Sequence, residues 1–208
     1  MRKLLITGRN GFIGTHLNKF LSTKSFDIIN SVKTDEINLC DWKEVKALNK
    51  AETIIHLASK NFIPESFEIP LEYYNNNIIS TLNILEKAKT DCANVVFFST
   101  YVYGTPKYLP IDEDHVKNPL NPYTQSKLIC EELCKAYSRD FGIPVTIFRP
   151  FNIFKFNSLF FLRWFFIIVL NFNYFKKTIL LKFSFKNPQC LLNIIIFYFY
   201  FNNNLQNV

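Results

Sequence analysis

Short runs of apolar residues alternate with amphipathic stretches from Met1 to about residue 153. The apolar runs lie at 4–6, 27–29, 53–55, 94–98 and 144–148. Runs without polar alternation are typical of parallel strands that are covered on both faces. Candidate helices lie between them, at 16–21, 42–48, 73–89 and 123–141. This order predicts an α/β fold with a doubly wound, Rossmann-like parallel sheet.

Residues 154–208 break this pattern. They contain no Gly, Ala, Asp or Glu, and Phe, Asn, Leu, Ile, Lys and Tyr dominate them. A folded domain of that length nearly always uses some of the four missing types. The abundant types have A/T-rich codons, so we interpret the tail as an AT-rich gene read in the wrong frame. The sequence thus predicts a domain at 1–153 and an aberrant, apolar, low-complexity tail at 154–208.

A membrane segment is the competing interpretation of the tail. The apolar run at 159–170 is only about a dozen residues long, and Arg163 interrupts it. Because a membrane-spanning helix needs about 20 apolar residues, a membrane attachment is disfavoured.

Charge and cysteine content exclude several classes of protein. Six of the 24 basic residues and none of the 17 acidic residues lie beyond residue 153, so the net charge of +7 falls to +1 over residues 1–153. Nucleic-acid binding therefore has no support from the globular part. The five cysteines show no C-x-x-C pair and no metal-ligand spacing, so we predict buried thiols and no metal. No signal peptide opens the chain, which favours a cytoplasmic location.

Three glycines follow the first apolar run, at Gly8, Gly11 and Gly14. Glycine permits a tight turn between a strand and a helix, and it lets a pyrophosphate reach the amides of the helix N-terminus. The spacing is G-x-x-G-x-x-G rather than the G-x-G-x-x-G of the standard dinucleotide fingerprint. On its own this turn is weak evidence for a dinucleotide site, since close packing of a loop would also explain it.

A second group of residues could carry acid–base chemistry. Tyr123 and Lys127 are four positions apart on a predicted helix, so they project from one face. A nearby ammonium favours the phenolate and lowers the pKa of a tyrosine. Ser99 ends the predicted strand at 94–98, at the edge where open α/β sheets bind ligands.

Taken together, the motifs resemble the extended short-chain dehydrogenase/reductase superfamily, in its NAD-dependent epimerase/dehydratase branch, which acts mostly on nucleotide sugars. The match covers residues 1 to about 153. Its motifs are T-G-x-x-G-F-I-G at 7–14, N-L-C-D at 38–41, H-L-A-S at 56–59, Asn77 with S-T-L-N at 80–83, S-T-Y-V-Y-G at 99–104, Pro122-Tyr123 with Lys127, and R-P-F-N at 149–152.

This resemblance implies a role for each matching residue. Ser99 would be the catalytic hydroxyl in contact with substrate, Tyr123 the general acid/base, and Lys127 the lysine that holds the nicotinamide ribose. Asn152 would contact the diphosphate of the sugar nucleotide. The cofactor would lie along Gly8, Asn10, Gly11, Phe12, Ile13, Gly14, Asp41 (at the adenine), Leu57, Ala58, Ser59, Asn77 and Phe151. The implied chemistry is oxidation of a sugar carbinol by hydride transfer to NAD.

Which dinucleotide binds depends on the residues after the second strand. The family usually places an acid there to bind the ribose hydroxyls, whereas this chain has Asn30-Ser31-Val32-Lys33. An acid repels a 2′-phosphate, while Ser31, Lys33 and Arg9 could accept one. NAD is the expected cofactor, with NADP as the alternative.

Thr100 and Tyr101 stand where sugar-nucleotide 4,6-dehydratases carry an acidic pair. Elimination of water needs that acid and base, so a dehydratase is disfavoured. The resemblance then predicts an NAD(P)-dependent nucleotide-sugar epimerase of the UDP-glucose 4-epimerase type. An NADPH-dependent nucleotide-sugar ketoreductase and an inactive remnant that at most binds a dinucleotide are the alternatives.

Near residue 154 the resemblance ends. The family continues there with a Tyr-Gly-Pro segment and a smaller substrate domain, whereas this chain has F-K-F-N at 154–157. This break coincides with the change in composition, so we expect the substrate domain to be lost. Relatives often pair through the helices that correspond to 73–89 and 123–141, which favours a homodimer.

Overall fold

A computed structural model describes residues 3–22, 27–32, 36–150, 165–168 and 181–184. Its main sheet has five parallel strands in the order β2-β1-β3-β4-β5. The strands are β1 (Lys3–Thr7), β2 (Asp27–Val32), β3 (Thr53–His56), β4 (Asn94–Phe98) and β5 (Val145–Phe148). Each falls on one of the apolar runs, which confirms the predicted doubly wound sheet.

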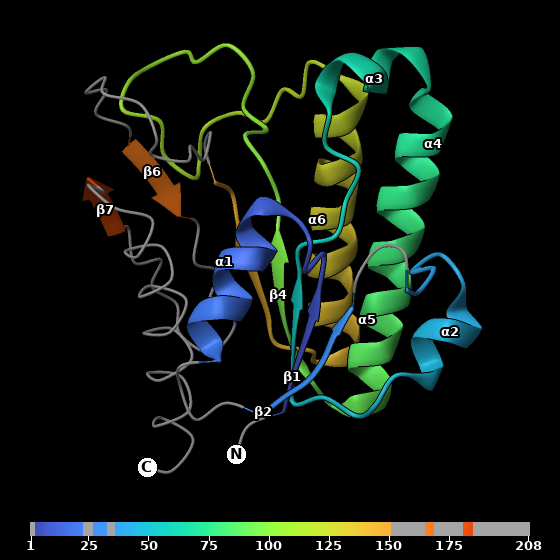
Figure 1. The fold of residues 1–208 in the computed structure, drawn as a ribbon. Coiled ribbons are helices and arrows are strands. Elements are labelled where there is room, and N and C mark those ends of the chain that lie inside the picture. The colour runs from blue at the N-terminus through green and yellow to red at the C-terminus, as the bar shows by residue number, and fades with distance from the viewer. Residues whose placement is uncertain (1–2, 23–26, 33–35, 151–164, 169–180, 185–208) are drawn as a thin grey trace.

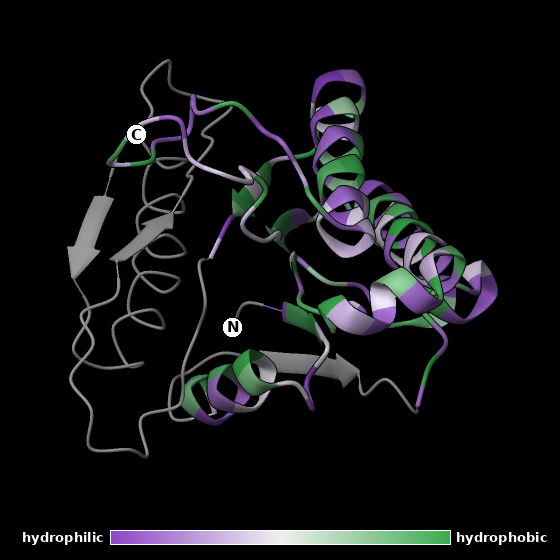
Figure 2. Ribbon diagram, turned by 90° about the horizontal axis from the view of Figure 1, so that it is seen from above, coloured by the Kyte–Doolittle hydropathy of each residue, from purple (hydrophilic) through white to green (hydrophobic). Residues whose placement is uncertain are grey.

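Helices cover both faces of this sheet (Figures 1 and 2). Helix α1 (Phe12–Leu21) lies on one face, and α2 (Trp42–Ala47), α5 (Ser80–Asp91) and α6 (Pro122–Phe141) lie on the other. The main core joins the strands to the second group of helices through fully buried side chains such as Leu5, Val45, Ile84 and Cys130. Burial of both sheet faces explains why the strands are continuously apolar.

The helix predicted at 73–89 is longer and less regular than expected. It consists of α4 (Pro70–Tyr74), a π-helical turn η1 (Asn75–Ile79) and α5. Within η1 the carbonyl of Asn77 accepts hydrogen bonds from the Thr81 hydroxyl at 2.7 Å and the Cys130 thiol at 3.3 Å. A short helix α3 (Ile63–Glu68), with Pro64 in its first turn, was missed by the sequence pattern.

Because the strands are parallel, their carboxyl ends meet at one edge of the sheet. The glycine turn follows β1 there, Leu57 follows β3, Ser99 follows β4 and Arg149 follows β5. The first turn of α6, which carries Tyr123, begins at the same edge.

Beyond residue 150 the structure describes two short strands, β6 (Phe165–Ile168) and β7 (Leu181–Ser184), which pair antiparallel in a separate sheet. The predicted boundary at 153 and most of the tail lie outside the described residues. Within the described ranges, no helix has both the length and the apolar character that crossing a bilayer requires.

Candidate cofactor and catalytic site

The turn after β1 leaves no room for a side chain at Gly8 or at Gly14. A Cβ on Gly8, whose φ is +73°, would lie 2.7 Å from the amide nitrogen of Ala58. A Cβ on Gly14 would lie 2.2 Å from the carbonyl oxygen of Gly8. At Gly11 the nearest atom to such a Cβ is 3.3 Å away, which is less restrictive. The turn therefore packs directly against the segment that follows β3.

This turn leads into the N-terminus of α1. Gly11 is the N-cap and makes no side-chain capping bond, and Phe12 and Ile13 open the helix. The unpaired amides and the helix dipole at such a terminus attract a phosphate group. The glycine turn and α1 thus fit the diphosphate of a dinucleotide, with Asn10 exposed in the turn.

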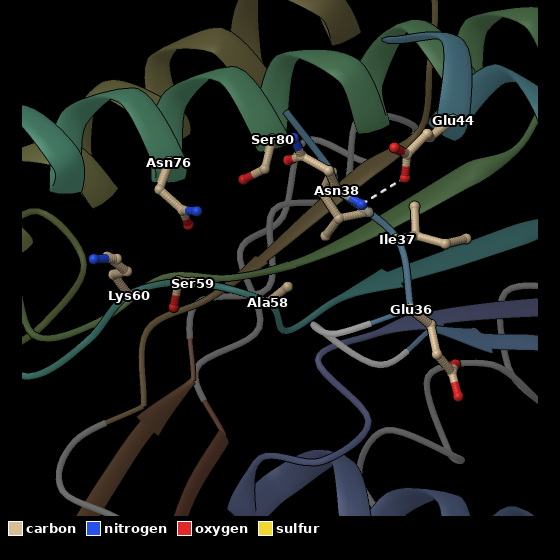
Figure 3. Close-up of a pocket in the computed structure, with 10 residues that line it drawn as sticks. Glu36, Ile37, Asn38, Glu44, Ala58, Ser59, Lys60, Asn76 and Ser80 are labelled. Carbon is tan, nitrogen blue, oxygen red and sulfur yellow. Dashed lines mark hydrogen bonds between the residues drawn. The ribbon is translucent and has the colours of Figure 1, made fainter. Parts of the chain in front are cut away.

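A pocket of about 470 Å³ lies between the segment after β2, the segment after β3 and η1 (Figure 3). Ala58 and Ser59 line it, as the sequence predicted, but Leu57 is not among its lining residues. The other lining residues were not predicted, and they are Glu36, Ile37, Asn38, Leu39, Glu44, Lys60, Asn76 and Ser80. Its size and mixed polar and apolar lining fit the adenosine half of a dinucleotide.

Asp41, which was expected to reach the adenine, is the N-cap of α2. It accepts a hydrogen bond from the Lys43 amide at 2.8 Å and does not line the pocket. Asn38 lines the pocket, and its backbone amide donates to Glu44 at 2.7 Å. The local reason is that Asp at an N-cap satisfies a free amide of the helix.

Asn77 is not among the residues that line the pocket, and its side chain joins three elements. Its side chain accepts from the Lys60 amide at 2.8 Å and donates to the Lys60 carbonyl at 3.0 Å and the Ser126 hydroxyl at 2.9 Å. The Ser126 hydroxyl donates to the Tyr123 carbonyl at 2.7 Å. Asn77 therefore links the segment after β3 to the first turn of α6, while its neighbour Asn76 faces the pocket.

His56 connects the same edge to β1. Its Nδ1 lies 2.7 Å from the Thr7 hydroxyl, and its Nε2 lies 3.2 Å from the Thr81 hydroxyl, which donates to Asn77. These partners fit a neutral ring that carries its proton on Nε2. Burial, helped by the charge of Lys127, lowers the pKa of His56 to about 3. His56 is therefore neutral and structural at physiological pH.

Tyr123 sits in the first turn of α6, which Asn121 and Thr124 fix by a reciprocal capping box. Burial raises the pKa of Tyr123, and a hydrogen bond with the Thr100 side chain lowers it in part. The Lys127 ammonium lies 4.3 Å from the centre of the Phe97 ring, and burial lowers its pKa. The structure thus places both residues at the sheet edge, but the net pKa change of Tyr123 is opposite to the predicted one because burial dominates.

Ser99 is buried beside an ion pair. Its hydroxyl donates to Oε1 of Glu131 at 2.6 Å, and Arg149 holds both carboxylate oxygens of Glu131, at 2.8 and 2.6 Å. A third bond joins Arg149 to the Tyr103 hydroxyl at 2.7 Å. Glu131 was not singled out from the sequence. It lies four positions after Lys127, on the same face of α6.

Several predicted site residues cannot be placed. Ser31 lies in β2, of which the structure describes the backbone, paired with Ile6 of β1. Lys33, Phe151 and Asn152 lie outside the described residues.

Comparison with known proteins agrees with this architecture. Residues 4–155 match the model of the NAD dependent epimerase/dehydratase family. A putative UDP-glucose 4-epimerase of Methanocaldococcus jannaschii is 36% identical over 73% of this chain and 56% of that protein. A GDP-6-deoxy-D-mannose reductase of Pseudomonas aeruginosa is 30% identical over 73% of this chain and 52% of that protein.

Among solved structures, UDP-glucose 4-epimerase from Brucella ovis in complex with NAD superposes with a TM-score of 0.69, at 28% identity, over 73% of this chain and 52% of that one. The chain spans about half the length of the curated relatives that it matches. The family model covers well over half of the chain, and the glycine turn, the five-stranded sheet and the Tyr123–Lys127 helix agree with it. The chain therefore belongs to the NAD dependent epimerase/dehydratase family.

Proposed function

We propose that this chain binds NAD, with the diphosphate at the glycine turn and the adenosine in the pocket beside Asn38. The observation that carries the proposal is that a turn closed to side chains at Gly8 and Gly14, a helix N-terminus and a pocket of about 470 Å³ adjoin one sheet edge. The similar structure from Brucella ovis holds NAD. The nicotinamide end would then extend toward Tyr123 and Lys127.

The pocket favours NAD over NADP through Glu36. This residue lies 22 positions after Gly14 and lines the pocket beyond the end of β2. An acid about 20 residues after the glycine turn binds the ribose 2′-hydroxyl in NAD enzymes, and its charge repels a 2′-phosphate. Of the basic residues that the structure describes, Lys60 alone lines the pocket, and its ammonium contacts the Glu72 carboxylate at 2.5 Å.

Replacing Glu36 by glutamine should therefore weaken the discrimination against NADP. We expect the ratio of the NADP and NAD dissociation constants to fall by about tenfold, since removing one nearby like charge is worth about 1.4 kcal/mol. Fluorescence titration with both dinucleotides measures this ratio. Glu52→Gln is the matched control, because Glu52 is exposed before β3, at the opposite edge of the sheet. An unchanged ratio of the two dissociation constants in Glu36→Gln would show that Glu36 does not select the cofactor.

For the reaction, we propose nucleotide-sugar epimerisation of the UDP-glucose 4-epimerase type. A bound nicotinamide would supply the hydride acceptor and donor for a sugar carbinol. Tyr123 would take the carbinol proton on its phenol oxygen and return it, and Lys127 would hold the nicotinamide ribose. The match to a putative UDP-glucose 4-epimerase and the presence of Glu36 in the pocket lining support this choice.

One alternative has specific support. The similarity to a GDP-6-deoxy-D-mannose reductase favours a nucleotide-sugar ketoreductase that uses NADPH. A protein that binds a dinucleotide without turnover stays the other alternative predicted from the sequence. A homodimer through α5 and α6, which pack side by side on one face of the sheet, stays a prediction from the resemblance.

Incubating the chain with NAD and UDP-glucose and following UDP-galactose by NMR tests the epimerase. Tyr123→Phe should lower turnover by about 10²–10⁴-fold, the usual contribution of a positioned acid or base. Equal turnover in Tyr123→Phe would contradict the assigned role. NAD binding without turnover would support the non-catalytic alternative, and consumption of NADPH with a 4-keto sugar nucleotide would support the reductase.

A further inference from the structure

Two segments of the chain supply separate walls of the cofactor pocket. The segment after β2 supplies residues 36–39, and the helical segment of η1 and α5 supplies Asn76 and Ser80 (Figure 3). Residues 36–39 belong to no strand or helix. Their position therefore depends on individual hydrogen bonds rather than on a sheet ladder, and so does the space between the two walls.

Asn83 joins these two walls. It lies one turn after Ser80 on α5, and its side-chain amide donates to the Leu39 carbonyl at 2.9 Å. Asn83 is 8% exposed and is not among the residues that line the pocket, whereas Leu39 lines it. A hydrogen bond fixes both the distance and the direction of its acceptor within narrow limits. Helix α5 therefore holds the segment after β2 at one spacing.

Other bonds give residues 38–41 a compact shape. The Asn38 amide donates to Glu44 at 2.7 Å, and the Asn38 side-chain and backbone carbonyls accept from the amides of Cys40 at 3.0 Å and Asp41 at 2.9 Å. These bonds are local and do not reach the helical wall. The Cys40 thiol donates to the Asn76 carbonyl of that wall at 3.7 Å, but a thiol is a weak donor. The bond from the Asn83 amide is the stronger of these two.

We propose that Asn83 is a positioning residue for the adenosine end of the cofactor. By holding the Leu39 carbonyl it sets the width of the pocket. The nature of the ligand rests on the proposed function, while the position of the wall rests on the geometry alone. A wall that is already in place spares the ligand the entropy of ordering it, so loss of the Asn83 bond should weaken binding.

Hydrogen exchange in the full chain without ligand measures the wall directly. Asn83→Leu keeps a side chain of similar size and removes the donor. We expect the amides of Asn38, Cys40 and Asp41 to exchange about tenfold faster in this variant, because the segment opens more often once its bond to α5 is lost.

Lys87→Met is the matched control on the same helix. Lys87 is 3% exposed and pairs with Asp91 at 2.8 Å, and the Asp91 carboxylate accepts the Ala51 amide before β3, at the opposite edge of the sheet. This variant should lower the thermal unfolding temperature, because it breaks a buried ion pair. It should leave exchange of the amides at 38–41 unchanged, which separates the position of the wall from the stability of α5.

Binding of AMP measures the consequence for the site. By equilibrium dialysis, Asn83→Leu should bind AMP about tenfold more weakly than the unchanged chain, the size of effect expected for one hydrogen bond. Lys87→Met should bind AMP as tightly as the unchanged chain. If Asn83→Leu does not fold, Asn83→Ser should give the same results, since its hydroxyl is too short to replace the amide and crowds nothing.

Amide exchange at 38–41 that stays slow in the Asn83 variants would overturn the proposal. Faster exchange with unchanged AMP affinity would overturn it as well, and so would equal effects in Lys87→Met. If the unchanged chain binds no AMP, the proposed function fails, and faster exchange in Asn83→Leu would still support Asn83 as the residue that positions this wall.

Discussion

Replacing Glu131 by alanine is expected to lower the free energy of unfolding by about 3–5 kcal/mol, the usual cost of removing one partner of a buried ion pair. Arg149 is 3% exposed in the unchanged chain, and the change removes its carboxylate partner. The Ser99 hydroxyl also loses its acceptor. Burial alone lowers the pKa of Arg149, but the bonds and charge of Glu131 raise it above its usual value. Urea unfolding followed by circular dichroism measures the loss.

Glu132→Ala is the control for this prediction. Glu132 neighbours Glu131 on α6 and pairs with Lys135 at 2.6 Å, but the Glu132 side chain is 61% exposed. An exposed pair of this kind contributes about 0–1 kcal/mol. Equal losses in the two variants would mean that Glu131 does not hold the ends of β4 and β5 to α6.

The second large effect is expected at the glycine turn. Gly14→Ala would bring a Cβ within 2.2 Å of the Gly8 carbonyl oxygen and 2.8 Å of the Arg9 Cα, so the turn must open. Because that turn aims the amides of α1 at the diphosphate, we expect NAD affinity to fall by at least about 100-fold, or about 2.7 kcal/mol. Equilibrium dialysis with labelled NAD measures the affinity of both forms.

Gly11→Ala is the control. It tests whether the loss of NAD affinity in Gly14→Ala comes from the clash of the new Cβ or from the loss of a flexible glycine. Its Cβ would meet one atom at 3.3 Å, and the backbone there is extended, with φ −68° and ψ 168°. This variant should keep most of the affinity. Tight binding by Gly14→Ala would show that the turn does not hold the diphosphate.

Much of the fold could be predicted because it depends on local signals. Continuous apolar runs marked all five strands of the main sheet, and the amphipathic stretch at 123–141 marked α6. The glycine turn could also be predicted from the sequence. A Cβ at Gly14 would lie 2.2 Å from the Gly8 carbonyl oxygen, so this position requires glycine. The family follows from these features and from the matched residues 4–155.

The details of the site could not be predicted, because they depend on which group competes for each hydrogen bond. Asp41 caps the N-terminus of α2, and Asn38 is the residue of this segment that lines the pocket beside Glu36, Ile37 and Leu39. Ser99 is drawn to Glu131, which lies 32 positions away in the sequence. The pKa of Tyr123 depends on burial, which spacing from Lys127 does not report. Glu36 was missed because it lies four positions beyond the end of β2 rather than at it.

The central claim is that this chain holds NAD at the glycine turn and the pocket beside Asn38. Isothermal titration of the full 208-residue chain with NAD tests this claim most directly. The account predicts one saturable site per chain, with tighter binding of NAD than of NADP. A chain whose circular dichroism shows the α/β fold but which releases no heat of binding with either dinucleotide, and binds neither by dialysis, would contradict it.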